Sequence, residues 1–141
     1  MNNFFYDNIT NKTNENTAYR NVIYTGKMQF VYMNIQPLDN IPKEIHNDHD
    51  QFFNIIKGEG IAIINDVEYK LYKNIGLIVP AGFTHQIINT SNCQPLKLYT
   101  IYSPPEHKPF TFNENNPDNI NIYKIKYIKY KLKYLQLKKN N

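Results

Sequence analysis

Residues 44–53 read EIHNDHDQFF, so a glutamate, two histidines, two aspartates and a glutamine stand within eight positions, just before two phenylalanines. Glutamate, histidine and glutamine are competent ligands for divalent metal ions. Side chains at positions i and i+2 of a β-strand share one face, so Glu44 and His46 point the same way if this segment is extended. The stretch is therefore either a polar loop in water or a group of metal ligands entering a β-barrel.

The rest of the chain favours the barrel. Hydrophobic residues make up 41% of the 141 residues, which is enough for one globular domain with a single core. Short apolar segments recur between turn residues at the spacing of an all-β protein. We expect eight strands and no helix before residue 117; the strands are residues 19–25, 28–35, 52–57, 61–64, 67–72, 76–80, 85–90 and 96–102. This pattern predicts an all-β barrel or sandwich.

The two ends of the chain differ from this middle part. Residues 1–16 are rich in Asn and Thr and are expected to form a loosely held polar arm. The barrel is expected over residues 17–112, and residues 113–141 form an Asn-rich linker and a basic tail. Residues 122–141 contain seven lysines and no acid, so residues 1–121 hold nine basic against twelve acidic residues, a net charge of −3. The basic character therefore belongs to the tail.

The structure of the tail is ambiguous in the sequence. Residues 128–134 alternate apolar residues and lysine, which is typical of a strand. A helix is favoured by apolar residues spaced three and four apart, namely Ile120, Tyr123, Tyr127, Tyr130, Tyr134 and Leu137. We prefer the helix because nothing in this long segment breaks one.

A second segment with a potential ligand begins 34 residues after Gln51, where His85 follows the turn VPAGF. Two imidazoles with oxygen donors suit Zn, Mn, Fe, Ni or Co and do not select one of them. We predict that Glu44, His46, Gln51 and His85 hold one divalent ion and leave positions open for water or substrate. The alternative is a pair of buried histidines that hydrogen-bond to backbone carbonyls. Gln51 is the weakest ligand of the four and can also orient the others.

Other polar residues of this region are assigned to the surface. His49 is out of phase with Glu44 and His46, so we expect it to be exposed in a loop together with Asp48 and Asp50.

The two ligand-bearing segments resemble the two signature motifs of the cupin superfamily. The first motif, Gly-x5-His-x-His-x3–4-Glu-x6-Gly, is similar to Glu44-x-His46-x4-Gln51-x6-Gly58. The second, Gly-x5-Pro-x-Gly-x2-His-x3-Asn, is similar to Asn74-x5-Pro80-x-Gly82-x2-His85-x3-Asn89. Among the chain positions quoted, three depart from the family, with Glu44 for His, Gln51 for Glu and Asn74 for Gly. Asparagine tolerates the left-handed backbone that glycine serves.

These departures resemble a subgroup of small single-domain bacterial cupins described as mannose-6-phosphate isomerase-like. Members carry a Glu-x-His…Asp-Gln-Phe-Phe segment, and the resemblance extends over about residues 15–110, through RNVIYTGKMQ and PLKLYTIYSPPEH. Zinc-dependent phosphomannose isomerases of the cupin class place two His, one Glu and one Gln on their metal. The resemblance implies a jelly-roll barrel, one divalent ion with zinc preferred, and conversion of mannose 6-phosphate to fructose 6-phosphate.

Such an isomerase needs a metal, a base that moves a proton between adjacent carbons, and a cation for the phosphate. The sequence does not identify the base, for which the candidates are Glu44, if it is not bound to the metal, or another carboxylate. Lys97 and the tail lysines are the phosphate candidates. Two alternatives stay open. One is a non-catalytic module that binds a metal or ligand, and the other is a different metal-dependent cupin enzyme, such as an iron oxygenase that uses Glu44, His46 and His85.

Location and partners follow from simple features. One cysteine, Cys93, excludes an intramolecular disulfide and suits a reducing compartment. The N-terminal residues lack the pattern of a secretory signal, and the apolar stretches are too short to span a bilayer. We expect a soluble cytoplasmic protein, or one of host cytoplasm or virion if a large DNA virus encodes it. Expected partners are a small-molecule substrate and a second copy of the chain; a nucleic acid is expected only through the tail.

Overall fold

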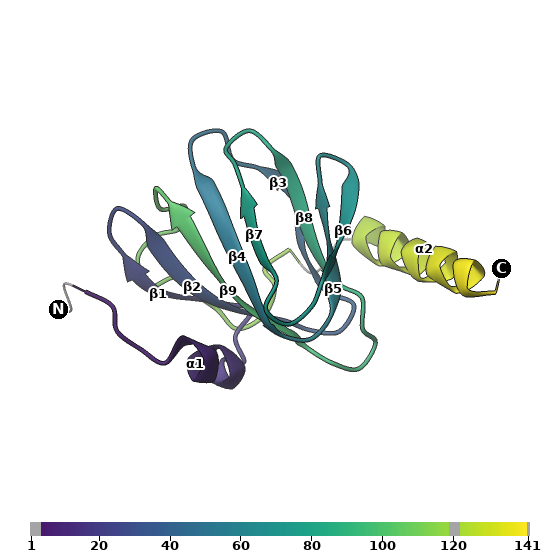
Figure 1. Cartoon of the computed structure of the whole chain (residues 1–141), viewed down its shortest axis with the longest axis horizontal. Helices are drawn as coiled ribbons and strands as arrows, with labels where there is room; N and C mark the ends of the chain where they lie inside the picture. Colours follow the sequence, from purple (N-terminus) through teal and green to yellow (C-terminus); the bar gives the residue numbers. More distant parts are fainter. Residues whose placement is uncertain (1–3, 119–121, 141) are drawn as a thin grey trace.

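The computed structural model describes residues 4–118 and 122–140, with only the backbone described for residues 122–129. Two antiparallel sheets pack face to face (Figure 1). The first has the strand order β10 (Phe112–Asn113), β1 (Arg20–Thr25), β2 (Gln29–Ile35), β9 (Leu96–Ser103), β4 (Asp50–Lys57) and β7 (Gly76–Val79). The second has the order β3 (Asn40–Ile45), β8 (Thr84–Asn89), β5 (Gly60–Ile64) and β6 (Val67–Leu71). The predicted all-β jelly roll is confirmed.

All eight expected strands are present, and β3 and β10 are additional. The alternation of a strand is clear in β4, where Gln51, Phe53 and Ile55 are buried between the sheets while Asp50 lies on the outer face. Completely buried side chains from the other strands fill the same interior, among them Met33, Ile35, Ile87, Leu96 and Leu98.

Strand β2 is buried along its whole length because the N-terminal segment covers its outer face. Helix α1 (Ile9–Glu15) packs against β2, β4 and β9, and Phe5 stacks on Phe30 with ring centroids 4.7 Å apart. The side chain of Asn8 caps the helix by accepting a hydrogen bond from the Asn11 amide. The expectation of no helix before the tail is therefore wrong. The polar sequence shows no apolar stripe, and the helix depends on its cap and on contact with the sheet.

The tail forms helix α2 (Ile122–Lys139), which confirms the preferred interpretation. Of the predicted stripe, Ile120 and the side chains of Tyr123 and Tyr127 lie outside the described residues. Lys131 of α2 forms an ion pair with Glu68 of β6, and Figure 1 shows the helix extending from that side of the barrel. Neither helix in the described part of the chain has the length and hydropathy needed to cross a bilayer.

Candidate metal centre

Strands β3 and β8 place two of the predicted ligands opposite each other. Glu44 and His85 are direct partners in the antiparallel register. His46 follows the last residue of β3 and turns its ring toward Glu44. The intervening Ile45 points outward and is 48% exposed, whereas the side chain of His46 is 10% exposed and that of His85 1%. The alternation predicted for Glu44 and His46 is confirmed.

Three donor atoms converge in this arrangement. Glu44 Oε1 lies 3.4 Å from His46 Nε2 and 3.4 Å from His85 Nε2. All three ligand atoms lie within 4.8 Å of one another. Two donors held about 2.1 Å from one ion at the tetrahedral angle are about 3.4 Å apart. The spacing is therefore that of atoms that can share a metal ion.

Three ring nitrogens of this cluster lack hydrogen bonds. His46 Nε2 and both ring nitrogens of His85 are buried and have no hydrogen-bond partner. Buried polar atoms in proteins are nearly always hydrogen-bonded, so a group of unsatisfied nitrogens needs an explanation. An ion bound by Nε2 of His46, Nε2 of His85 and the Glu44 carboxylate would satisfy the two Nε2 atoms, so the residues present fit a divalent metal.

Gln51 enters the interior from the opposite sheet. It is 1% exposed, and its Nε2 donates a hydrogen bond to Thr100 Oγ1 at 3.0 Å. Thr100 in turn donates to the carbonyl of Phe52 at 2.8 Å, which fixes the direction of the amide. Gln51 Oε1 is left buried without a partner. The amide nitrogen is thus held by the protein, and the oxygen is free to accept.

The backbone of two turns holds the ligands in place. The amide of Gly82 donates to the carbonyl of His46 at 2.7 Å, and the amide of Ala81 donates to Asp50 Oδ1 at 2.9 Å. Gly82 has a φ of 87°, a region that residues with a Cβ rarely adopt. These bonds join the turn before His85 to the loop that carries His46.

Electrostatics keep Glu44 charged. Burial by itself would raise the pKa of its carboxyl, but the contact with His85 and the charges of His46, His85 and Arg20 lower it further than burial raises it. The net effect is a lowered pKa. Glu44 is therefore a carboxylate at neutral pH, the form that binds cations.

The expectation that His49 is exposed is wrong, since the residue is only 4% exposed. Strand β3 ends at Ile45, so strand parity does not extend into the loop that carries His49. His49 Nδ1 lies 2.9 Å from the exposed Asp48, and its Nε2 lies 3.3 Å from Glu106 Oε2. The rings of His46 and His49 are 4.2 Å apart between centroids.

Glu106 completes a second cluster with His46 and His49. His46 lies between the two clusters: its Nε2 faces Glu44, and its Nδ1 lies 3.7 Å from Glu106 Oε2. A carboxylate beside one imidazole nitrogen commonly orients the other nitrogen toward a metal. Glu106 was not identified from the sequence, where its only signal is its place in the segment PPEH.

A buried glutamine positions Glu106. Gln29 is completely buried on β2, and its Oε1 accepts hydrogen bonds from the amides of Glu106 and His107 at 3.2 and 2.9 Å. Its Nε2 donates to the carbonyl of His107 at 2.7 Å. This clamp holds the loop after β9 against the end of the barrel where the ligands lie.

Tyr102 and His107 form a neutral pair beside the two clusters. The Tyr102 hydroxyl lies 3.3 Å from His107 Nε2. Burial, and to a lesser degree the charge of Glu44, raise the pKa of Tyr102. Burial and the charge of Arg20 lower the pKa of His107 to about 4. At neutral pH the phenol therefore keeps its proton and the imidazole is uncharged.

Lys97 is not placed to bind a phosphate at this site. It lies on the outer face of β9, and its Nζ donates to the carbonyl of Asn16, at the end of α1, at 2.8 Å. Strand parity puts Lys97 on the face opposite to Tyr102, which lies at the site. The suggestion that it holds a substrate phosphate is therefore wrong.

Known proteins with similar sequences and structures agree with this architecture. Residues 31–102 match the family model described as Cupin domain. The chain is 39% identical to uncharacterized protein L612 of Acanthamoeba polyphaga mimivirus, over 98% of this chain and 92% of the viral protein. It is 37% identical to uncharacterized protein YrkC of Bacillus subtilis (strain 168), over 82% of this chain and 66% of that protein.

A solved structure supports the same assignment. The crystal structure of BH2720 from Bacillus halodurans superposes with a TM-score of 0.75 and 35% sequence identity, over 78% of this chain and 88% of that one. The family model, the two relatives and this structure coincide with a two-sheet barrel that brings the residues of both motifs to one end. The chain belongs to the cupin domain family.

Proposed function

We propose that the chain binds one divalent metal ion through Glu44, His46 and His85, with Gln51 as a fourth ligand, and that it is an aldose–ketose isomerase of the mannose 6-phosphate type. The observation that carries the proposal is the group of buried, unpartnered nitrogens around one charged carboxylate. Zinc is the preferred ion because imidazole and carboxylate ligands suit it.

When bound, the ion would polarise the substrate carbonyl and hold the neighbouring hydroxyl. The chain's own residues then have separate tasks. Glu106 is the proposed base that moves a proton between the two carbons, because its side chain is 35% exposed and lies outside the first cluster. His49, held by Asp48, contacts Glu106 from the interior and orients it. Tyr102 keeps its proton and can donate a hydrogen bond to a substrate oxygen.

One observation favours a second candidate function. Glu44, His46 and His85 are two histidines and one carboxylate, the set that holds iron in many oxygenases. In that case the purified protein would carry iron and consume oxygen with its substrate. The metal content separates this candidate from the isomerase.

The test begins with elemental analysis of the purified chain. We expect about one zinc ion for each wild-type chain and none in the His46→Ala, His85→Ala double variant. Lys43→Ala is the matched control, since Lys43 is exposed on β3 and pairs with Asp66 outside the cluster. A double variant that keeps its metal would disprove the proposed ligand set.

Activity is then measured with a coupled assay on mannose 6-phosphate. We expect turnover that a chelator abolishes and added zinc restores. Metal binding without turnover would show a non-catalytic module instead of an isomerase. Iron together with oxygen uptake would show the oxygenase.

A further inference from the structure

The side chain of Arg20 starts from the inner face of the six-stranded sheet. In the antiparallel register Arg20 pairs with Met33, and the same row continues through Leu98 to Ile55. These three neighbours are all core residues. Residues that are direct partners across a sheet share one face, so Arg20 projects into the space between the sheets.

The guanidinium group is only partly satisfied by the protein. Arg20 Nη1 donates to Asn113 Oδ1 at 2.9 Å, and the guanidinium carbon lies 5.3 Å from the centroid of the Tyr19 ring. Arg20 Nε is buried and has no hydrogen-bond partner. Arginine carries five N–H donors in a fixed planar fork, so a free edge of this fork is suited to two oxygens of one anion.

The charge of Arg20 acts on the site. Its charge helps burial to lower the pKa of His107 and partly opposes the rise that burial gives the pKa of Tyr102, and both residues lie beside the metal cluster. Lys97, the lysine expected to take this role, is turned to the outer face. Arg20 therefore supplies positive charge inside the barrel, within electrostatic reach of residues beside the metal centre.

We propose that Arg20 binds an anionic group, a phosphate or a carboxylate, of the molecule that occupies the metal centre. The proposal rests on the function proposed above, because it names the residue that binds the part of the substrate that does not contact the metal. A guanidinium pairs with either anion through two parallel hydrogen bonds, which lysine cannot reproduce. The substrate would thus be held at two points, by the metal centre and by Arg20.

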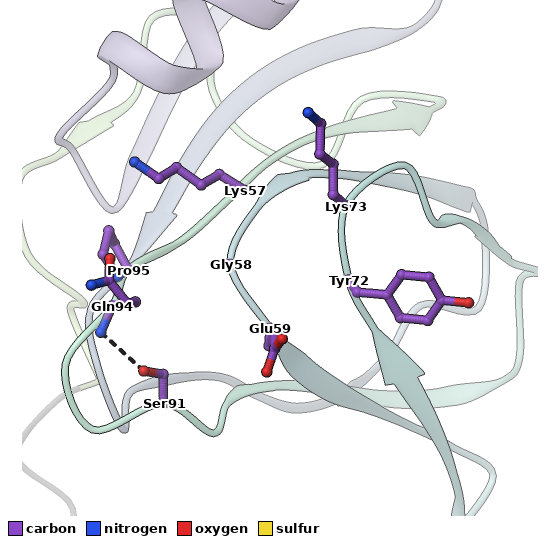
Figure 2. Close-up of a pocket in the computed structure, with 8 residues that line it drawn as sticks. All are labelled: Lys57, Gly58, Glu59, Tyr72, Lys73, Ser91, Gln94 and Pro95. Atoms are coloured by element: carbon purple, nitrogen blue, oxygen red, sulfur yellow. Dashed lines mark hydrogen bonds between the residues drawn. The ribbon is translucent and has the colours of Figure 1, made fainter.

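A second place for an anion lies at the opposite end of the barrel. This cavity has a volume of about 520 Å³. Figure 2 shows Lys57, Lys73, Glu59 and Tyr72 around it. Both lysines are exposed, and the carboxylate of Glu59 lines the same cavity. An anion would meet a like charge there, so this cavity is the weaker candidate. Lys73→Gln therefore serves as the control that removes one positive charge far from Arg20.

The experiment measures binding of inorganic phosphate and of acetate to the metal-free, full-length protein by calorimetry. In the absence of metal, the heat of binding does not include coordination of the anion to a metal ion. We expect one of the two anions to bind the wild type and Arg20→Gln to weaken that binding about tenfold or more, as expected for a charge-assisted hydrogen bond. Arg20→Lys, which keeps the charge, should fall between them, and Lys73→Gln should stay within about twofold of wild type.

Asn113→Ala separates binding from a purely structural role. If Arg20 only joins β1 to β10 through Asn113, this variant and Arg20→Gln should lower the melting temperature alike and leave anion binding unchanged, which would overturn the proposal. Wild-type protein that binds neither anion, or loss of binding in Lys73→Gln alone, would also overturn it. The metal content of the purified protein tests the proposed function separately. If the wild type contains no metal and its anion binding still depends on Arg20, the proposed function is refuted and the role of Arg20 stands.

Discussion

Glu44 shows how one half-buried side chain can be charged and still lack a hydrogen bond to the imidazoles beside it. It sits at a position where the cupin motif has histidine, and it faces His85 directly across the β3–β8 pair. Its two imidazole neighbours approach one carboxylate oxygen to 3.4 Å without forming aligned hydrogen bonds. A neutral amide at this position would keep the shape but lose the charge that attracts a cation.

At this scale we predict that Glu44→Gln weakens zinc binding by at least about tenfold, since even residues that only support metal ligands commonly change affinity by 10–100-fold. Competition with a colorimetric chelator measures the affinity. Glu59→Gln, at the other end of the barrel, is the matched control and should bind zinc as wild type does. Equal affinity in the two variants would remove Glu44 from the ligand set.

The loop after β9 depends on an element far away in sequence. Gln29, at the start of β2, holds Glu106 and His107 through three hydrogen bonds to their backbone. The loop has few apolar contacts with the barrel, since Phe110 is 79% exposed. Strand β2 therefore decides where the second carboxylate of the site lies.

For this element we predict that Gln29→Ala lowers the free energy of unfolding by about 1–3 kcal/mol, because buried backbone groups lose their partners. Amide hydrogen exchange at residues 106 and 107 should accelerate much more than exchange in β4. Thr25→Ala removes only the contact between Thr25 Oγ1 and Gln29 Nε2 and is the control. Unchanged exchange in the loop would show that Gln29 does not hold it.

The two ends of the barrel carry different features. Loops with the histidines and Glu106 gather at one end, and the cavity between Lys57 and Lys73 lies at the other. The sheets end in strands β10, β7, β3 and β6, so pairing with a second copy through an edge stays a prediction. An ion that binds only the folded chain raises the free energy of unfolding of the whole molecule.

We therefore predict that zinc at about 100 times its dissociation constant raises the free energy of unfolding by about 2.7 kcal/mol. Urea denaturation with and without a chelator measures this difference. The His46→Ala, His85→Ala double variant should show no difference between the two conditions. Stabilisation of that variant by zinc would mean that the ion binds elsewhere.

Much of the fold is readable from the sequence alone. Turn residues between apolar segments located eight strands, because strand propensity and turn chemistry are local properties. Local patterns failed for α1, whose polar residues form a helix only with the Asn8 cap and the sheet beside it. Local patterns also did not predict β10, a two-residue strand that pairs with β1.

For the site, the sequence by itself determined which residues can bind a metal and that Glu44 and His46 share a face, since alternation is a property of the extended chain. Only the tertiary structure decided that His49 is buried, that Glu106 joins His46 and His49, that Arg20 projects into the barrel, and that Lys97 turns to the outer face. These placements depend on where a strand ends and on contacts between residues up to 93 positions apart, such as Arg20 with Asn113. Such long-range contacts leave no periodic trace in the sequence.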